Sequence, residues 1–277
     1  MNKMNKEYQQ SWISCYIYCD TTANEFLVKK IFPITQYALK NKLANQYFFI
    51  RYGDKYGFHI RLRFKGEINL LEYTLRPLLE KSFTNNRFTR YRPEIQRYGG
   101  VEAMLIAEKL FEASSNTALS FLKSSDYSDY ERSLGFALQM NLSMLHSFGL
   151  HKDEAQDFFK HFTIKSNING FKNNLNQQYA SIIPTLSHMW SILDQNNSFE
   201  YEWFNEWIRE VKIIEKDIKK VYTKHLLNPR YSKKLHIHNP LWYLYDSYLH
   251  MNNNRLGIYR IDELFLIYIL NKFFKNL

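Results

Sequence analysis

The amino-acid sequence predicts an α+β fold, with an amino-terminal antiparallel sheet and flanking helices followed by a mainly helical carboxy-terminal half. Apolar and polar residues alternate strictly over 58–64, which is typical of a β-strand that buries one face. Beyond residue 126 the apolar residues have helical spacing instead. Hydrophobic residues make up 45% of the 277 residues and aromatic residues 17%, a composition that can form a large core.

The first predicted elements are a strand and a helix. Residues 12–19 are rich in Trp, Ile, Tyr and Cys, which favour a strand, and residues 23–32 have helical apolar spacing. Pro33 is expected to end this helix. Cys15 and Cys19 lie in the strand with their Cα atoms about 13 Å apart, too far for a disulfide, so we interpret both as packing residues.

An antiparallel hairpin is predicted next. Residues 46–52 and 58–65 are both β-rich. The five residues between them, 53–57, include two glycines that suit a hairpin loop. Arg51 is then expected near the loop.

The remainder of the α+β half is predicted to contain a helix, a turn and one more strand. Residues 70–83 have a helical pattern, 85–87 favour a turn, and 89–92 favour a short strand. Gly99-Gly100 then allows a sharp turn into a helix over 101–112, because glycine adopts backbone conformations that other residues avoid.

The carboxy-terminal half is predicted to be helical. The expected helices cover residues 130–148, 152–162, 177–193, 201–222 and 241–251. Two segments rich in Asn, Gly or Pro, 167–176 and 226–240, are predicted loops. No linker is long enough to separate independent domains, so we expect one domain over 1–277, with an α+β lobe (10–125) and a helical lobe (126–277).

The formal net charge of +10 at pH 7 has two interpretations. It can indicate contact with an acidic peptide or a tRNA-bearing partner, or it can reflect an AT-rich genome, since the lysines are dispersed. No apolar run reaches the roughly 18 to 20 residues that cross a bilayer, and the amino terminus lacks the apolar core of a signal peptide. We therefore expect a cytoplasmic protein without a membrane span.

The alternating segment 58–64 also predicts that His59, Arg61 and Arg63 share one face of a strand. The planar guanidinium group of arginine matches carboxylate and phosphate groups. This face therefore predicts an anion-binding surface. An amphipathic edge strand with a solvated basic face would show the same pattern.

Two further segments carry candidate chemistry. A glycine pair at a helix start, as at Gly99-Gly100, lets an anion approach free amide groups, although a tight turn would need the same residues. Histidine is suited to proton transfer near neutral pH, and His250 lies in the last predicted helix. Beside the apolar stripe of Trp242, Tyr245 and Leu249, a buried and purely structural histidine would fit equally well.

Three segments in order carry a resemblance to one family. They read FHIRLRF at 58–64, PEIQRYGG at 93–100 and YLHMNNNRL at 248–256. Together they resemble the glutamate-elimination domain of LanB-type lantibiotic dehydratases, which also occurs as a separate protein in thiopeptide-type bacteriocin pathways. The resemblance runs from about Trp12 to Arg255, and it departs at Gln96, where many members of the family carry Glu.

The resemblance implies a lyase that eliminates glutamate from glutamylated Ser or Thr of a ribosomal precursor peptide, leaving dehydroalanine or dehydrobutyrine. Such a β-elimination needs a base for the α-proton and cations that hold the departing glutamate. By this resemblance His250 is the acid–base residue, and Arg63 and Arg97 hold glutamate. Glu94 is a second carboxylate for proton transfer or for orienting an arginine, although its spacing from Arg97 would also suit a structural ion pair.

Further residues are expected to bind or position the substrate. These are Arg51, His59, Arg61, Asn254 and Arg255. The sequence contains no GxSxG, HExxH, GxxxxGK[ST] or GxGxxG motif, so it does not resemble serine hydrolases, zinc peptidases, P-loop proteins or Rossmann enzymes. We expect catalysis without a metal or bound cofactor, with the named side chains converging on one anion-accepting pocket.

The expected partners are the precursor peptide and a separate glutamyl-tRNA-dependent ligase. The large glutamylation domain of full-length dehydratases is missing from the sequence, so we expect dehydration to need that ligase. The oligomeric state, a homodimer included, stays open. Two other functions are compatible with the resemblance: a pyridine synthase that joins two dehydroalanines, which has no glutamate to hold, and a noncatalytic subunit that presents the precursor peptide.

Overall fold

The computed structural model describes residues 11–124, 126, 128–163, 172–224, 239 and 241–277. Contacts within the chain define two compact units. One unit consists of residues 1–94 and 114–128, and the other of residues 95–113 and 129–277. The first contains an antiparallel sheet with helices and the second is helical, so the predicted α+β fold class is confirmed.

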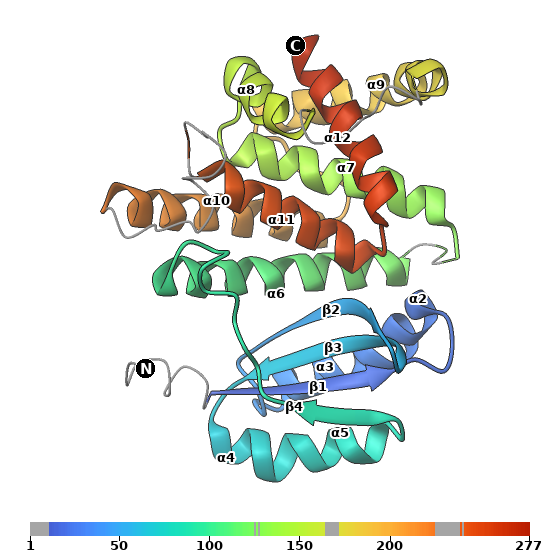
Figure 1. Cartoon of the computed structure of the whole chain (residues 1–277), viewed down its shortest axis with the longest axis vertical. Helices are drawn as coiled ribbons and strands as arrows, with labels where there is room; N and C mark the ends of the chain where they lie inside the picture. Colours follow the sequence, from blue (N-terminus) through green and yellow to red (C-terminus); the bar gives the residue numbers. More distant parts are fainter. Residues whose placement is uncertain (1–10, 125, 127, 164–171, 225–238, 240) are drawn as a thin grey trace. The chain divides into compact units, whose positions relative to one another are not determined.

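The first unit contains a four-stranded antiparallel sheet in the order β2-β3-β1-β4 and the helices that connect its strands (Figure 1). Its elements are β1 (Trp12–Tyr18), α2 (Ala23–Phe26), the π-helical turn η1 (Leu27–Ile31), α3 (Phe32–Lys40), β2 (Gln46–Asp54), β3 (Gly57–Lys65), α4 (Ile68–Leu70), the π-helical turn η2 (Leu71–Leu75), α5 (Arg76–Ser82) and β4 (Asn86–Thr89). This β-α-β-β-α-β order is the arrangement called ferredoxin-like.

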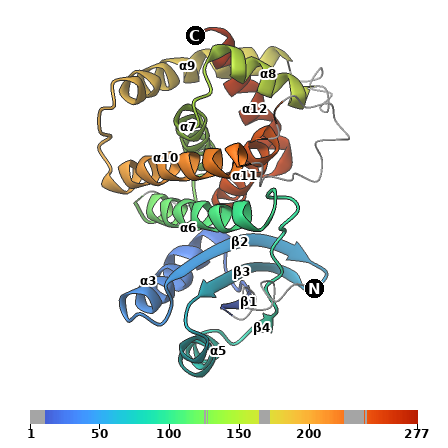
Figure 2. The same ribbon diagram turned by 90° about the vertical axis from the view of Figure 1, so that its left-hand side faces the viewer.

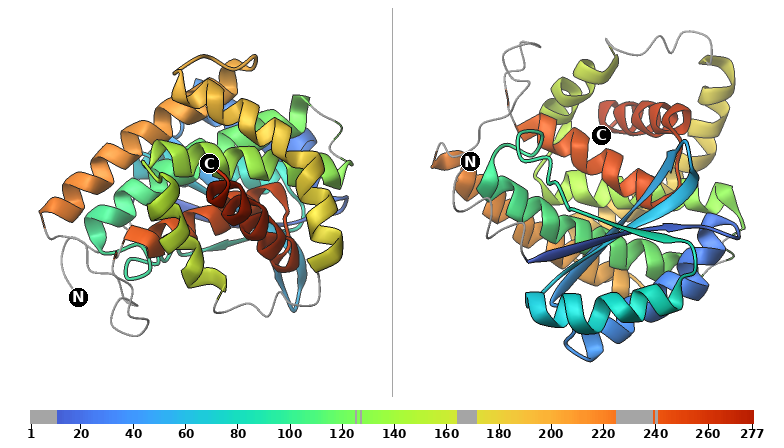
Figure 3. Two further views of the ribbon diagram at one scale, coloured as in Figure 1. Left: turned by 90° about the horizontal axis from the view of Figure 1, so that it is seen from above. Right: turned by 60° about the horizontal axis from the view of Figure 1, so that its bottom comes forward.

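The connecting helices cover one face of the sheet, as Figure 2 and the right-hand view of Figure 3 show, and the side chains on that face are mainly apolar. Ile60, Leu62 and Phe64 of β3 are completely buried on this face. Leu27 of η1 and Leu75 of η2 are buried as well. Because strand side chains alternate between faces, the odd-numbered residues of β3 all lie on the opposite face.

The prediction that Pro33 ends the first helix is wrong. The helix continues through η1 into α3 and ends at Lys40. At the π-helical turn the backbone amide of Phe32 donates to the carbonyl oxygen of Leu27. Pro33 then occupies the first turn of α3, where its missing amide is tolerated.

The hairpin is confirmed, but its loop is shorter than the predicted 53–57. Strand β2 extends to Asp54 and β3 begins at Gly57, which leaves a two-residue loop. The backbone amide of Tyr56 donates to Asp54 Oδ1 at 2.9 Å and stabilises this turn. Gly57 has a φ of 121°, which favours glycine at this position.

The fourth strand lies earlier in the sequence than predicted. It covers Asn86–Thr89, where the sequence favours a turn at 85–87 and a strand only at 89–92. Antiparallel pairing with β1, in which Tyr16 faces Arg87, supplies backbone partners that override the local turn preference.

The second unit is helical. Its elements are the first half of α6 (Val101–Ser124), α7 (Tyr130–Ser147), α8 (Lys152–Thr163), α9 (Lys172–Asp194), α10 (Glu202–Thr223), α11 (Leu241–Leu256) and α12 (Arg260–Lys275). Helix α7 lies between α8, α9 and α12 on one side and α10 and α11 on the other (Figure 1). Apolar residues are buried on most of its surface, as expected for a central helix.

Most predicted helices of this unit are confirmed, with two corrections. Helix α12 was not predicted, and α9 begins at Lys172, so the loop predicted at 167–176 is wrong from that residue onward. Residues 167–171 lie outside the described residues, as does the loop predicted at 226–240 except for Asn239. None of the described helices is long and apolar enough to cross a membrane.

Candidate functional site

The polar face of the first unit carries the arginines that the sequence singled out. The β3 residues His59, Arg61 and Arg63 lie on this face, and each has a neighbour on both adjacent strands. The cross-strand rows are Tyr18–His59–Tyr52, Tyr16–Arg61–Ile50 and Ser14–Arg63–Phe48. The alternation in the sequence therefore predicts the arrangement of this face correctly.

Aromatic rings hold the guanidinium group of Arg63. Its guanidinium carbon lies 5.1 Å from the ring centre of Phe48 and 4.7 Å from that of Tyr91. Its Nε atom is buried and has no hydrogen-bond partner among the described residues. Burial lowers the pKa of Arg63, yet arginine stays protonated at neutral pH. A buried cation with an unpaired donor is suited to an anionic ligand.

Two hydroxyl groups extend this row across the sheet. Ser14 pairs with Arg63 on one side and with Thr89 on the other. Ser14 is 2% exposed, and neither its Oγ atom nor Thr89 Oγ1 has a hydrogen-bond partner among the described residues. We refer to Ser14, Arg61, Arg63 and Thr89 as the sheet cluster. Its donors suit the oxygen atoms of a carboxylate.

His59 positions Arg61. Arg61 Nε donates a hydrogen bond to His59 Nε2 at 3.3 Å, and His59 Nδ1 lies 3.2 Å from the carbonyl oxygen of Gly57. This pair of contacts fits a neutral ring with its proton on Nδ1. Burial lowers the pKa of His59, whose ring stacks 4.9 Å from that of Tyr16. The Arg61 guanidinium carbon lies 3.3 Å from the ring centre of Tyr52.

The structure does not bring Arg51 together with Arg61 and Arg63. In the observed register Arg51 faces Ile60, so its side chain lies on the apolar, helix-covered face of the sheet and is 8% exposed. A five-residue loop would have placed Arg51 opposite His59. The shorter loop shifts the register by one residue and moves the side chain to the other face.

Glu94 is exposed and follows β4 in a segment without regular secondary structure. Burial dominates the lowered pKa of Arg63, and the negative charge of Glu94 is among the smaller influences that raise it. The carboxylate therefore lies near enough to act on Arg63. The ion pair between Glu94 and Arg97 stays a prediction.

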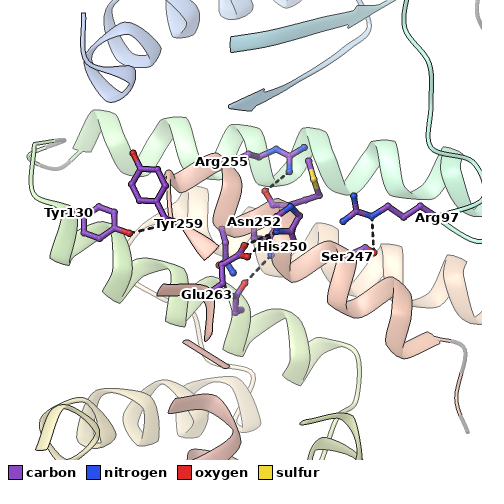
Figure 4. A network of polar contacts seen from close by, with 11 residues as sticks. Arg97, Tyr130, Ser247, His250, Asn252, Arg255, Tyr259 and Glu263 are labelled. Atoms are coloured by element: carbon purple, nitrogen blue, oxygen red, sulfur yellow. Dashed lines mark hydrogen bonds and ion pairs between the residues drawn. The ribbon is translucent and has the colours of Figure 1, made fainter. Parts of the chain in front are cut away.

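Arg97 lies in the second unit, against α11. Its Nε atom donates to Ser247 Oγ at 3.3 Å (Figure 4). The neighbouring Tyr98 ring stacks on Tyr248 with ring centres 6.0 Å apart, which fixes the segment before α6. Gly99 and Gly100 have φ values of 85° and 117°, so the predicted glycine turn into the helix is confirmed.

His250 lies one turn after Ser247 on α11, and its side chain is 47% exposed. Its Nδ1 atom lies 2.9 Å from Oε1 and 3.2 Å from Oε2 of Glu263, in the first turn of α12 (Figure 4). His250 is therefore not the buried histidine that the sequence left open, and its role in catalysis stays a prediction. We refer to Arg97, Ser247, His250 and Glu263 as the helix cluster.

Sequence reasoning missed Glu263 because it missed α12. Acidic residues at 262 and 263 followed by apolar residues at helical spacing were a usable signal for a helix start. The pairing with His250 depends on the turn between α11 and α12, and spacing in the sequence alone does not predict it.

Arg255 and Asn254 lie at the end of α11. Arg255 is completely buried; its Nη1 donates to the carbonyl oxygen of Met251 at 2.8 Å, and its guanidinium carbon lies 5.0 Å from the ring centre of Phe111. The carbonyl oxygen of Asn254 accepts from the amide of Gly257 at 3.0 Å, which closes the helix. Both residues support the helix end that carries His250.

Neither cysteine nor metal chemistry has a candidate centre in the described part of the chain. Cys15 and Cys19 are free thiols, and burial raises the pKa of Cys15 to about 12 and that of Cys19 to about 11. Thiolates are therefore scarce at neutral pH. Among the described residues, no group of three or more His, Cys, Asp or Glu side chains could hold a metal ion.

The fold and the two clusters define an α+β protein with an arginine-bearing sheet face and a histidine–carboxylate pair. The family model described as "Lantibiotic biosynthesis dehydratase C-term" matches residues 12–274. The chain belongs to this family, as the three sequence segments indicated.

Two curated proteins show the same relationship. The chain is 30% identical over 171 residues to the subtilin biosynthesis protein SpaB of Bacillus subtilis, covering 57% of this chain and 16% of SpaB. It is 26% identical over 274 residues to the nisin biosynthesis protein NisB of Lactococcus lactis subsp. lactis, covering 95% of this chain and 25% of NisB. The chain thus spans a quarter or less of the length of these relatives.

Solved structures share the fold. The tRNA-dependent lantibiotic dehydratase MibB from Microbispora sp. 107891 superposes with a TM-score of 0.68 at 17% identity, over 95% of this chain and 28% of MibB. TsrL superposes with a TM-score of 0.71 at 14% identity, over 95% of this chain and 94% of TsrL. The pyridine synthase TbtD from thiomuracin biosynthesis superposes with a TM-score of 0.73 at 11% identity, over 96% of this chain and 98% of TbtD. At these identities the likeness concerns the fold alone.

Proposed function

We propose that this protein is a lyase that eliminates glutamate from glutamylated Ser or Thr residues of a ribosomal precursor peptide. The product is dehydroalanine from Ser or dehydrobutyrine from Thr. A separate glutamyl-tRNA-dependent ligase supplies the ester. Membership of the lantibiotic dehydratase family supports this class of reaction.

The observation that carries the proposal is the environment of Arg63. Its buried Nε atom has no hydrogen-bond partner among the described residues. The same holds for the hydroxyl groups of Ser14, which is its neighbour on β1, and of Thr89, which is the next residue in the same cross-strand row. A buried cation is stable when an anion neutralises it and accepts its hydrogen bonds. The carboxylates of a departing glutamate supply both. The sheet cluster accordingly holds the leaving group.

His250 of the helix cluster takes the α-proton. The Cα–H bond breaks, its electron pair forms the Cα=Cβ double bond, and the Cβ–O bond breaks as glutamate leaves with a carboxylate. Proton removal builds up negative charge on the carbonyl group next to Cα. Arg97, fixed through Ser247 one turn from His250, supplies positive charge on the same side of α11.

A synthetic precursor peptide with a glutamyl-Ser ester tests the proposal directly. Incubation with the protein is expected to release free glutamate and to leave a peptide lighter by the mass of glutamate, which mass spectrometry detects. An ester that stays intact with folded protein would contradict the proposal.

Two further experiments distinguish the proposed lyase from a pyridine synthase and from a noncatalytic presenting subunit. A peptide with two dehydroalanines is expected to stay unchanged, whereas a pyridine synthase, whose fold this chain shares, would convert it. The variant His250→Ala is expected to bind the glutamylated peptide and release no glutamate. A noncatalytic presenting subunit would tolerate this change.

A further inference from the structure

The His250–Glu263 contact joins α11 to α12 across the turn that connects the two helices. Glu263 is only 14% exposed on its side chain, whereas His250 is 47% exposed. Gly257, with a φ of 79°, ends α11 and lets the chain turn toward α12. The ring of His250 is thus open on one side and held on the other.

The start of α12 is itself fixed from α7. The hydroxyl group of Tyr130 donates to Asp262 Oδ2 at 2.6 Å. The rings of Tyr130 and Tyr259, both labelled in Figure 4, stack with centres 6.2 Å apart. Leu266, one turn further along α12, is 1% exposed. The carboxylate of Glu263 is therefore presented from a rigid first turn.

We propose that Glu263 is a positioning residue that fixes the protonation pattern of His250. An ionised carboxylate only accepts hydrogen bonds, so it requires the proton of a neutral His250 to lie on Nδ1. The Nε2 atom is then unprotonated and lies on the side of the ring away from Glu263. This is the nitrogen that can remove the α-proton. The catalytic part of this inference rests on the proposed function.

The carboxylate has a second effect during the reaction. When Nε2 accepts the proton, the ring becomes positively charged, and the nearby negative charge of Glu263 stabilises that charge. Glu94, which the sequence analysis suggested for proton transfer or for orienting an arginine, is exposed and follows β4, and its charge acts on Arg63. The structure assigns the carboxylate that orients His250 to Glu263.

The variants Glu263→Gln and Glu263→Asp distinguish hydrogen-bond polarity from shape. Glutamine keeps the size of the side chain but offers both a donor and an acceptor, so it allows either neutral form of His250. Aspartate keeps an acceptor-only group at a shorter reach. The position of the His250 proton and the kcat for glutamate release are therefore expected to be closer to wild type in Glu263→Asp than in Glu263→Gln.

Nuclear magnetic resonance of the ¹⁵N-labelled full chain reads the protonation pattern without any substrate. The two ring nitrogens of a neutral histidine have well separated ¹⁵N shifts, and His250→Gln identifies the signal among the nine histidines. At about pH 8, where an ordinary histidine is neutral, His250 is expected to carry its proton on Nδ1. Glu263→Gln is expected to shift the population toward Nε2–H. A wild-type Nε2–H form would overturn the inference.

Glutamate release by the same variants completes the test. Glu263→Gln is expected to lower kcat roughly 100-fold with KM within about twofold, since general base catalysis is lost and substrate contacts are kept. Asp194→Asn is the matched control, because Asp194 makes a similar contact in the same unit: its Oδ1 atom lies 2.9 Å from Nε2 of His146. This substitution is expected to leave kcat unchanged. Full activity in Glu263→Gln would overturn the inference.

The two proposals fail in different ways. In the first case, wild-type protein releases no glutamate, but His250 carries its proton on Nδ1 and Glu263→Gln shifts that proton toward Nε2. The positioning role of Glu263 then stands and the assigned reaction fails. If wild-type protein releases glutamate and Glu263→Gln does so equally fast, the reaction stands and the positioning role fails.

Discussion

Burial of Arg63 suits its guanidinium group to bind a carboxylate. Water no longer satisfies its Nε atom, and the rings of Phe48 and Tyr91 hold the guanidinium group without neutralising it. Aromatic contacts stabilise a cation but accept no strong hydrogen bond. The residue thus retains its capacity to bind a carboxylate with two parallel hydrogen bonds.

This geometry predicts that lysine does not replace Arg63. A hydrogen bond to a charged group contributes about 1.5 to 3 kcal/mol, and lysine cannot span both carboxylate oxygens, so Arg63→Lys is expected to lower kcat/KM for glutamate release by about 10- to 100-fold. Arg209→Lys, in which the exposed Arg209 of α10 pairs with Glu202, is the matched control and is expected to stay within about twofold. Wild-type activity in Arg63→Lys would show that the fork geometry is unimportant.

The lowered pKa of His59 predicts that the free energy of unfolding depends on pH. Burial lowers its pKa in the folded state below the ordinary value of 6.5, so the unfolded chain binds the proton more readily. Its contribution is therefore fully present above pH 6.5 and is lost as the pH falls below that value. Nearby Asp54 opposes the shift, and Arg61 and Arg87 add to it.

The variant His59→Phe tests this assignment. The phenyl ring keeps the ring contacts with Tyr16 and Tyr18 but does not titrate. Urea unfolding at pH values above and below 6.5 is expected to show a smaller acid-induced loss of stability in His59→Phe than in the wild-type protein. An equal loss in both proteins would mean that His59 titrates normally in the fold.

At the scale of elements, the sheet was the easier part to predict. Strict alternation over 58–64 placed His59, Arg61 and Arg63 on one face, because period-two patterns follow directly from strand geometry. The face of Arg51 could not be read this way, since it depends on the loop length that sets the register of β2 against β3.

The helix cluster was harder to predict for a similar reason. Spacing on α11 relates Ser247 to His250, but the partner of His250 comes from α12 across the turn at Gly257. Such pairings follow from tertiary packing and not from local propensity. The resemblance to a family named Arg97 and His250, whereas Glu263 required the structure.

Helix α12 is expected to be held by its buried face. Ile269 is completely buried and Ile261 is 69% exposed on the same helix. Ile269→Ala is therefore expected to lower the free energy of unfolding by about 2 to 5 kcal/mol, and Ile261→Ala by less than about 0.5 kcal/mol. Chemical denaturation of both variants checks this, and equal effects would contradict the packing of α12.

At the scale of the whole molecule, the chain contains two units, and each carries one of the two clusters. In the proposed reaction the sheet cluster binds the leaving carboxylate, and the helix cluster supplies the base and the carboxylate that orients it. The proposed reaction needs both tasks in one turnover. Loss of either cluster should therefore stop glutamate release even when the other is intact.

Glutamate release from one glutamylated peptide by wild-type protein, Arg63→Ala and His250→Ala measures this requirement directly. Each substitution is expected to slow release by roughly 100-fold or more, because one removes the leaving-group contact and the other the base. Arg209→Ala, on the exposed surface of α10, is expected to match the wild-type rate. Wild-type rates in either the Arg63 or the His250 variant, with the fold intact, would contradict the account.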